Sequence, residues 1–217
     1  MSSYTSSSMT AQDVISHVLR QFGDEANVQV TNDDILRWIN AGQSEIFIKA
    51  EPLKAQTTAD LISMQTDYAM PAGILRVQNI TVNGLAVEPM STQEFEEYIQ
   101  KHDPNSISSG QPVVWSEWGG VLSFYPKPDA GAVGGIRLRY VKAPTKVTAP
   151  ADELSIPDAF YNRLVEYVLQ QVYELDENFS AADTKAQQFA QNLEGQVSRN
   201  QVVPDVYPTI TILDEDL

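Results

Sequence analysis

The periodicity of apolar residues changes twice along this 217-residue chain, and that change limits the fold more than any other feature. Near both ends, apolar residues recur every three or four positions, whereas between about residues 59 and 142 they alternate with polar ones. The first spacing is typical of amphipathic helices and the second of half-buried strands. We therefore predict an α+β fold: a bundle of about four main helices, with a β-rich insertion that forms a small antiparallel sheet domain.

The first two helices are predicted at residues 10–23 and 32–49. Thr10 and Thr31 each stand three positions before an aspartate, which is the spacing of a capping box at a helix N-terminus. Gly42 lies inside the second helix, where glycine costs about 1 kcal/mol relative to alanine. We therefore expect another helix to approach the backbone closely at Gly42.

Two further helices are predicted at residues 157–175 and 180–199. Pro157 suits the first position of the third helix, and Ser180 with Asp183 has capping spacing for the fourth. The third helix carries a broad apolar stripe and is expected to be the best buried. The stripe of the fourth is narrower, which is typical of a surface helix or of a seam between helices.

The middle of the chain contains two hairpin signals, Asn83-Gly84 and Gly119-Gly120, each between runs rich in β-favouring residues. Both pairs suit tight turns that need positive φ. Ser91 begins a short capped helix between them. The stretch "FYPKPDAGAVGG" is expected to be a non-catalytic connection before the strand "IRLRYVK", in a sheet of four to six strands.

Composition argues against several functional classes. The chain has no cysteine, and its 29 acidic and 14 basic residues give a formal net charge of −15. Such a charge disfavours a protein that holds nucleic acid by neutralising phosphates, although a repelling wall would suit one that lets nucleic acid slide past. Arg137 and Arg139 share one strand face and are expected to pair with carboxylates.

No motif for catalysis, cofactor binding or metal binding stands out. His17 and His102 are far apart and lack metal-ligand spacing, and no glycine pair is followed by the Lys-Ser/Thr of a phosphate-binding loop. Acidic pairs such as Asp33-Asp34 fall in first helical turns, where carboxylates are favoured anyway. We therefore predict no enzyme, no catalytic residue, no cofactor and no metal.

Two aromatic residues in the β-rich region are candidates for partner contacts, Trp118 and Tyr125. Trp115 and Trp118 are three positions apart on a predicted strand, so their side chains should point to opposite faces, one toward the core and one exposed. An exposed tryptophan on a sheet can stack on sugar rings. A carbohydrate-binding module is therefore kept as the alternative function.

Both ends of the chain break these patterns. Residues 1–9 are predicted to be a flexible polar lead, and residues 200–217 an extended C-terminal arm. The arm contains the β-favouring run from Thr209 to Leu213, and such a run can add to an open sheet edge of its own or a neighbouring subunit. Its candidate contact residues are Val206, Tyr207, Ile210 and Ile212.

The order of these segments resembles the head-to-tail adaptor, or connector, proteins of tailed phages. The segments that carry the resemblance include "DDILRWINAGQSEIF", "GGVLSFYPKPDAG" and "LSIPDAFYNRLVEYVLQQVYE", and it covers residues 10–199 as one adaptor domain. The chain is most similar to the adaptor of short-tailed phages called tail tubular protein A.

The resemblance implies a structural role in the virion neck, after assembly in the host cytoplasm. It implies a homo-oligomeric ring, commonly of twelve subunits, between the portal protein and the tail nozzle protein, and attachment of tail fibres to the sheet. DNA would pass through the lumen without specific binding, and no membrane would be involved.

Overall fold

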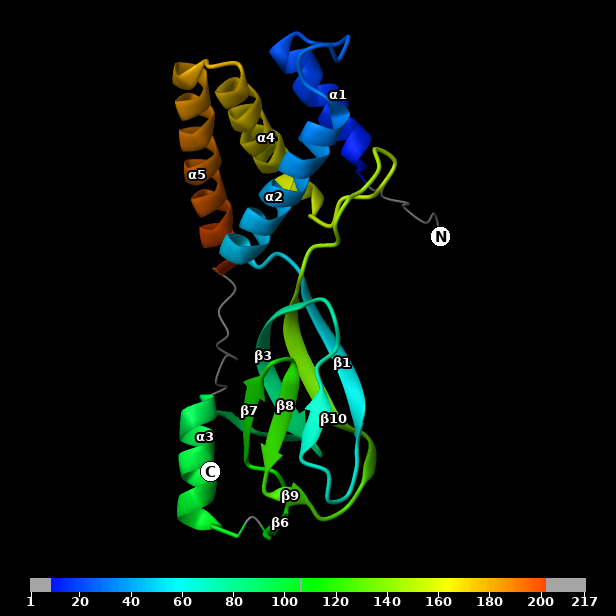
Figure 1. The fold of residues 1–217 in the computed structure, drawn as a ribbon, viewed down its shortest axis with the longest axis vertical. Helices are drawn as coiled ribbons and strands as arrows, with labels where there is room; N and C mark the ends of the chain where they lie inside the picture. Colours follow the sequence, from blue (N-terminus) through cyan, green and yellow to red (C-terminus); the bar gives the residue numbers. More distant parts are fainter. Residues whose placement is uncertain (1–8, 106, 202–217) are drawn as a thin grey trace, which may run out of the picture. The chain divides into compact units, whose positions relative to one another are not determined.

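A computed structural model describes residues 9–105 and 107–201, and it shows an α+β fold with helices and largely antiparallel sheets (Figure 1). The chain divides into two compact units. The helical unit combines the chain before Glu51 with the chain after Thr145, and the β unit comprises residues 51–145. The helical unit is therefore built from two pieces of chain that are separated in sequence by the β unit.

The described part of the helical unit contains four α-helices and one 3-10 turn: α1 (Ala11–Phe22), α2 (Asn32–Ala50), the turn Asp158–Phe160, α4 (Tyr161–Leu175) and α5 (Phe179–Gln201). Helix α4 contacts α1, α2 and α5, although α1 and α2 each bury a larger share of their residues than α4 does, so the expectation that α4 is the best buried is not met. Its fully buried side chains are Leu164, Val165, Val168, Leu169 and Val172. Among the described side chains of α5, which end at residue 198, only Ala182, Phe189 and Leu193 are buried, consistent with its narrow stripe.

The predicted capping residues form hydrogen bonds at the N-termini of the first two helices. The Asp13 carboxylate accepts hydrogen bonds from the backbone N–H and the hydroxyl of Thr10, both at 2.8 Å. The hydroxyl of Thr31 bonds the Asp34 carboxylate at 2.6 Å and accepts from the Asp34 N–H at 3.2 Å. These hydrogen bonds lower the pKa of both carboxyl groups, so they hold the charged form at a helix start, where the macrodipole also favours it.

The starts of the last two helices differ from the prediction. Pro157 precedes a 3-10 turn, and α4 begins only at Tyr161, since the first turn of a helix often tightens to 3-10 geometry. Helix α5 begins at Phe179 because Asn178, not Ser180, caps it: its side-chain oxygen accepts from the Ala181 N–H at 3.3 Å. Asparagine is at least as good an N-cap as serine.

Gly42 marks the close approach of α2 and α4, as its position in mid-helix predicted. A Cβ atom at Gly42 would lie 2.7 Å from Leu164 Cδ1 and 2.8 Å from Tyr167 Cδ1. Both distances are shorter than carbon atoms tolerate, so a side chain at this position would require Leu164 and Tyr167 to shift.

The segment between the β unit and α4 is held against α2 by two side-chain amides. Asn40 donates to the Val147 carbonyl at 2.8 Å and accepts from the Val147 N–H at 2.9 Å. Gln43, fully buried, accepts from the Ser155 N–H at 2.8 Å. These amides satisfy backbone groups that would otherwise be buried without partners, and they join the two pieces of the helical unit.

Asp24 fixes the turn between α1 and α2. Its carboxylate accepts from the backbone N–H groups of Val28, Gln29 and Val30 at 2.8–3.1 Å. Asp24 is only 8% exposed. The hydrogen bond from Val28 contributes most to lowering its pKa, with smaller contributions from the other two.

The β unit contains ten short strands and helix α3 (Thr92–His102). Strands β1 (Lys54–Leu61), β10 (Ala132–Lys142), β3 (Ile74–Val82) and β4 (Leu85–Ala86) form one sheet, in that order. Strands β2 (Asp67–Ala69), β8 (Val121–Tyr125), β7 (Val114–Trp118) and β5 (Glu88–Pro89) form a second. Strands β6 (Ser109–Gly110) and β9 (Lys127–Pro128) make a separate parallel pair.

The two four-stranded sheets share one core. It is built from Ile80, Ile136 and Leu138 of the first sheet and Trp115 and Phe124 of the second, with neighbouring apolar residues. The sequence predicted a single sheet of four to six strands, so the second sheet corrects that expectation. The second sheet arises because the chain leaves the first sheet after β4 and joins the second at β5. Val87, between these two strands, is buried.

The hairpin signals were correct. Asn83 and Gly84 have φ of 52° and 82°, as a type I′ turn requires, and Gly119 and Gly120 also have positive φ. The predicted connection "FYPKPDAGAVGG" is shorter than expected, because Lys127–Pro128 form a strand and β10 already begins at Ala132. Strand β1 was missed in most of its length, since "KAQTTADL" lacks a clear apolar alternation.

Replacing Gly42 by alanine should destabilise the helical unit by about 1–3 kcal/mol, because overpacking between α2 and α4 exceeds the gain in helix propensity. Gly195 in α5 is the matched control, since a Cβ there has no atom within 4 Å. Gly195→Ala should stabilise by up to about 1 kcal/mol. Thermal unfolding followed by circular dichroism at 222 nm checks both, and equal effects would contradict the assigned helix contact.

Replacing Asp24 by asparagine should lower the Tm at neutral pH, because an amide cannot accept all three backbone hydrogen bonds. The folded-state pKa of Asp24 is depressed, so its stabilisation is present above the unfolded value of about 3.9 and is lost as pH falls through the folded pKa. The Tm difference from wild type should therefore shrink below about pH 4. Glu25→Gln is the control, and a difference that persists in acid would count against this role.

Candidate assembly surfaces

The carboxylates whose pKa is shifted are structural. Each of the six has a lowered pKa caused chiefly by hydrogen bonds to nearby backbone or hydroxyl groups: Asp13, Asp24, Asp34, Glu94, Asp103 and Asp152. A general acid needs the opposite, a carboxyl whose pKa is raised toward neutrality. These groups therefore cap helices and fix turns.

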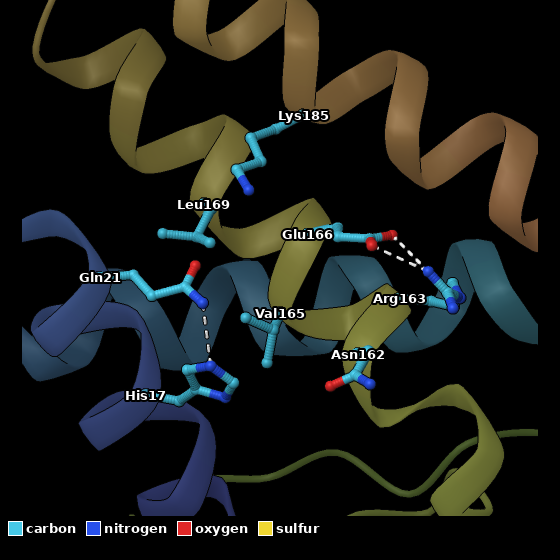
Figure 2. Close-up of a pocket in the computed structure, with 8 residues that line it drawn as sticks. All are labelled: His17, Gln21, Asn162, Arg163, Val165, Glu166, Leu169 and Lys185. Atoms are coloured by element: carbon cyan, nitrogen blue, oxygen red, sulfur yellow. Dashed lines mark hydrogen bonds and ion pairs between the residues drawn. The ribbon is translucent and has the colours of Figure 1, made fainter.

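The described residues contain a small polar pocket between α1, α4 and α5 (Figure 2). His17 and Gln21 reach it from α1, and Lys185 from α5. The Gln21 amide bonds His17 Nε2 at 3.0 Å, and His17 Nδ1 bonds the Tyr161 hydroxyl at 3.3 Å. Tyr161 in turn donates to the Asp13 carbonyl at 3.1 Å, so His17 belongs to a chain of hydrogen bonds that joins α1 to α4.

The other side of the pocket is occupied by an ion pair. Arg163 donates to both carboxylate oxygens of Glu166 at 2.8 and 3.0 Å (Figure 2). Asn192 of α5 donates to the same carboxylate at 3.0 Å. The cavity measures about 200 Å³, below the roughly 300–1,000 Å³ typical of small-molecule sites. The arrangement ties α5 to α4, and it contains no nucleophile beside a base.

Over residues 9–105 and 107–201, no group of three or more histidine, cysteine, aspartate or glutamate side chains is arranged to bind a metal ion. In the same part of the chain, no helix is both long enough and apolar enough to cross a membrane.

The second sheet has a partly covered face that carries Trp118. Helix α3 packs against Val114 and Tyr125 through Phe95, Tyr98 and Ile99. Trp118 lies on the same face, two alternations beyond Val114, and pairs with Val121 beside the hairpin turn. Trp118 is 76% exposed and Val121 is 38% exposed, whereas Trp115 is 9% exposed. One tryptophan is thus in the core and the other at the surface, as predicted.

Tyr125, the other sheet residue predicted to contact a partner, lies in the interior. It is 8% exposed, its ring packs edge-on against Tyr98 with centroids 6.0 Å apart, and its hydroxyl bonds Asp103. This burial leaves it little surface for a partner, because α3 covers its strand. The predicted arm contacts Val206, Tyr207, Ile210 and Ile212 lie outside the described residues.

The first sheet has an outer face that is basic. Arg137 and Arg139 point away from the core, since Ile136 and Leu138 between and beside them are buried. They were expected to pair with carboxylates, but no ion pair involves either one within the described residues. Arg139 donates to the neutral Gln56 at 3.3 Å instead. The reason is the strand register, which places Thr58 and Thr81 beside Arg137, and Gln56 and Asn79 beside Arg139.

A sequence model of the family described as SU10 adaptor protein matches residues 9–209. The match covers both units and nearly the whole chain, so the chain belongs to the SU10 adaptor protein family. The coarser part of the resemblance is thereby confirmed: this is a phage adaptor, a structural component of the virion. The narrower likeness to tail tubular protein A stays a prediction. No curated protein matches the chain.

The surface that sequence reasoning missed is the basic face with its edge strand β1. Arg137 and Arg139 were noticed, but Lys54 was not placed with them because β1 was not recognised. The signal that could have found it is the threonine pair Thr57-Thr58 opposite the alternating β10, since threonine favours strands.

Trp118→Ala should leave the stability of the β unit within about 0.5 kcal/mol of wild type, as exposed substitutions usually do. Trp115→Ala should cost about 3–5 kcal/mol, because it empties a site in the shared core. Chemical denaturation of each variant, followed by the fluorescence of the remaining tryptophans, measures both. A large loss from Trp118→Ala would mean that this ring supports the fold and is not available to a partner.

Proposed function

We propose that the chain is a head-to-tail adaptor that assembles as a ring between the portal protein and the tail nozzle of a phage. The observation that carries this proposal is the family match, which spans the helical and the β unit together. A structural adaptor acts through its surfaces.

In the proposed assembly, α4 and α5 line the contacts around the ring. Support comes from α5, which buries only a narrow stripe against the bundle and leaves most of its length exposed. The segment 200–217 would clasp a neighbour or the portal, and the β unit with Trp118 would offer the outer attachment for tail fibres. A closed ring is the usual outcome when copies of one chain associate head to tail.

The charge of the chain supports passage of DNA without retention. Because each chain has a net charge of −15, an assembled ring repels a phosphate backbone and gives it few cations to bind. The repulsion acts over about 8 Å at physiological ionic strength, so it operates on a duplex that passes close to the wall. The proposed channel therefore guides DNA without recognising its sequence.

The test is size-exclusion chromatography with light scattering, on the full chain alone and then with the portal protein of the same phage. We expect a ring, or a monomer that becomes a stoichiometric ring on the portal, since such assembly surfaces are often completed only on docking. A chain that stays monomeric and does not co-elute with the portal would contradict the proposal.

A further inference from the structure

Four basic side chains lie on one face of the sheet formed by β1, β10 and β3. The strand register places Lys54 and Arg76 on either side of Val141, and Arg139 and Arg137 follow at alternate positions along β10. Side chains at alternate positions share a face. The opposite face carries Ile136 and Leu138 and belongs to the core shared with the second sheet.

Three of these four cations have no acidic partner. Arg76 is paired with Glu51 at 2.6 Å, but within the described residues no ion pair is formed by Lys54, Arg137 or Arg139. All three are exposed. In a chain of net charge −15, an uncompensated basic face stands out and would attract an acidic group.

Next to this face the sheet ends in an open strand. Strand β1 has eight residues and its ladder runs to β10 alone among the described strands, so its outer edge has backbone groups free to pair. At the opposite end of the sheet, β4 has two residues. Proteins usually protect long edges with proline or several charges, and "KAQTTADL" has no proline and only Lys54 and Asp60 as charged residues.

We propose that the C-terminal segment of a second copy binds here. The run Thr209–Leu213 pairs with the outer edge of β1 as an added strand, and Asp214, Glu215 and Asp216 lie against Lys54, Arg137 and Arg139. The sequence of this segment matches both features of the site in order: five β-favouring residues, then three acidic ones. Added strands gain affinity from main-chain hydrogen bonds and specificity from side chains, and here charge supplies the specificity.

The choice of a second copy rests on the proposed ring. Each chain carries one donor segment and one acceptor edge, so two copies joined this way leave one donor and one acceptor unused. Such a contact is heterologous, and it propagates until the rotation closes a ring. The same pairing within one chain would use up both groups and build nothing.

An acidic peptide fits this face better than a nucleic acid does. Three uncompensated cations beside an overall charge of −15 attract a short acidic segment that comes close, whereas a long polyanion also meets the repulsion of the rest of the chain. The open edge of β1 can form main-chain hydrogen bonds with a peptide strand, whereas a phosphate backbone has no amide groups to pair with it.

Cross-linking tests the proposal directly, because the natural chain has no cysteine. Full-length Thr58→Cys chains are mixed with full-length Thr211→Cys chains that carry a larger affinity tag, and a short bis-maleimide is added to the free protein and to the protein with portal. We expect a product with the mass of one tagged and one untagged chain. Gln78→Cys, on β3 of the same sheet, replaces Thr58→Cys in the control mixture and should give little of this product.

The charge contribution is tested in the same assay. Reversing Arg137 and Arg139 to glutamate in the Thr58→Cys chain should lower the yield about tenfold, as expected for losing two surface ion pairs and gaining repulsion. The matched control Arg37→Glu with Lys101→Glu changes the net charge equally on other surfaces and should leave the yield within about twofold. Raising the salt to about 1 M should also lower the yield, because it screens the charges.

The outcomes separate this inference from the proposed function. No mixed product above that of the Gln78→Cys control, with or without portal, overturns the inference. A Thr58→Cys/Thr211→Cys chain that cross-links only within itself overturns the choice of a second copy. If light scattering shows a ring while cross-linking fails, the adaptor role stands and this contact is wrong; if no ring forms on the portal, the proposed function itself has failed.

Discussion

The helical unit depends on the two amides that bind the returning chain to α2. Asn40 and Gln43 bond backbone groups more than a hundred positions later in the sequence, at Val147 and Ser155. Without them, α4 would lose its fixed start, and α4 is the helix on which the other three pack. Because the entropic cost of closing a loop grows only with the logarithm of its length, an inserted unit of this size is tolerated provided that its ends are held.

The β unit is held at its ends by its own topology. The chain enters it through β1 and leaves through β10, and these two strands are antiparallel neighbours, with Lys54 opposite Val141. The Lys142 N–H also donates to the Leu53 carbonyl at 2.9 Å. The inserted unit therefore begins and ends at one place, as a hairpin does. The same arrangement explains why β1 is an edge strand, since its one described partner is the strand through which the chain leaves.

How much of the fold could be predicted depended on whether the information was local. Capping at Thr10 and Thr31, the turn at Asn83-Gly84 and the close approach at Gly42 are encoded within a few residues, and the structure agrees with each. The second sheet was not predicted, because the switch at Val87 depends on what its neighbours cover. Alternation correctly placed Trp115 and Trp118 on opposite faces, but it could not show which of them is exposed, nor that α3 covers Tyr125. Likewise, the solvation of Arg137 depends on which strands flank β10, and β1 carries too weak a pattern to be recognised alone.

Charge decides where copies of such a chain can touch. Two chains of net charge −15 repel each other over most of their surfaces once those surfaces come within about 8 Å at physiological salt. Association then requires a surface whose local charge is positive. Among the described residues, the outer face of β1 and β10 is such a surface. A localised basic face in an acidic chain gives the encounter a single preferred orientation, because every other approach meets like charge. In the proposed ring, this excess of acidic residues would disfavour wrong contacts between copies and would not retain DNA.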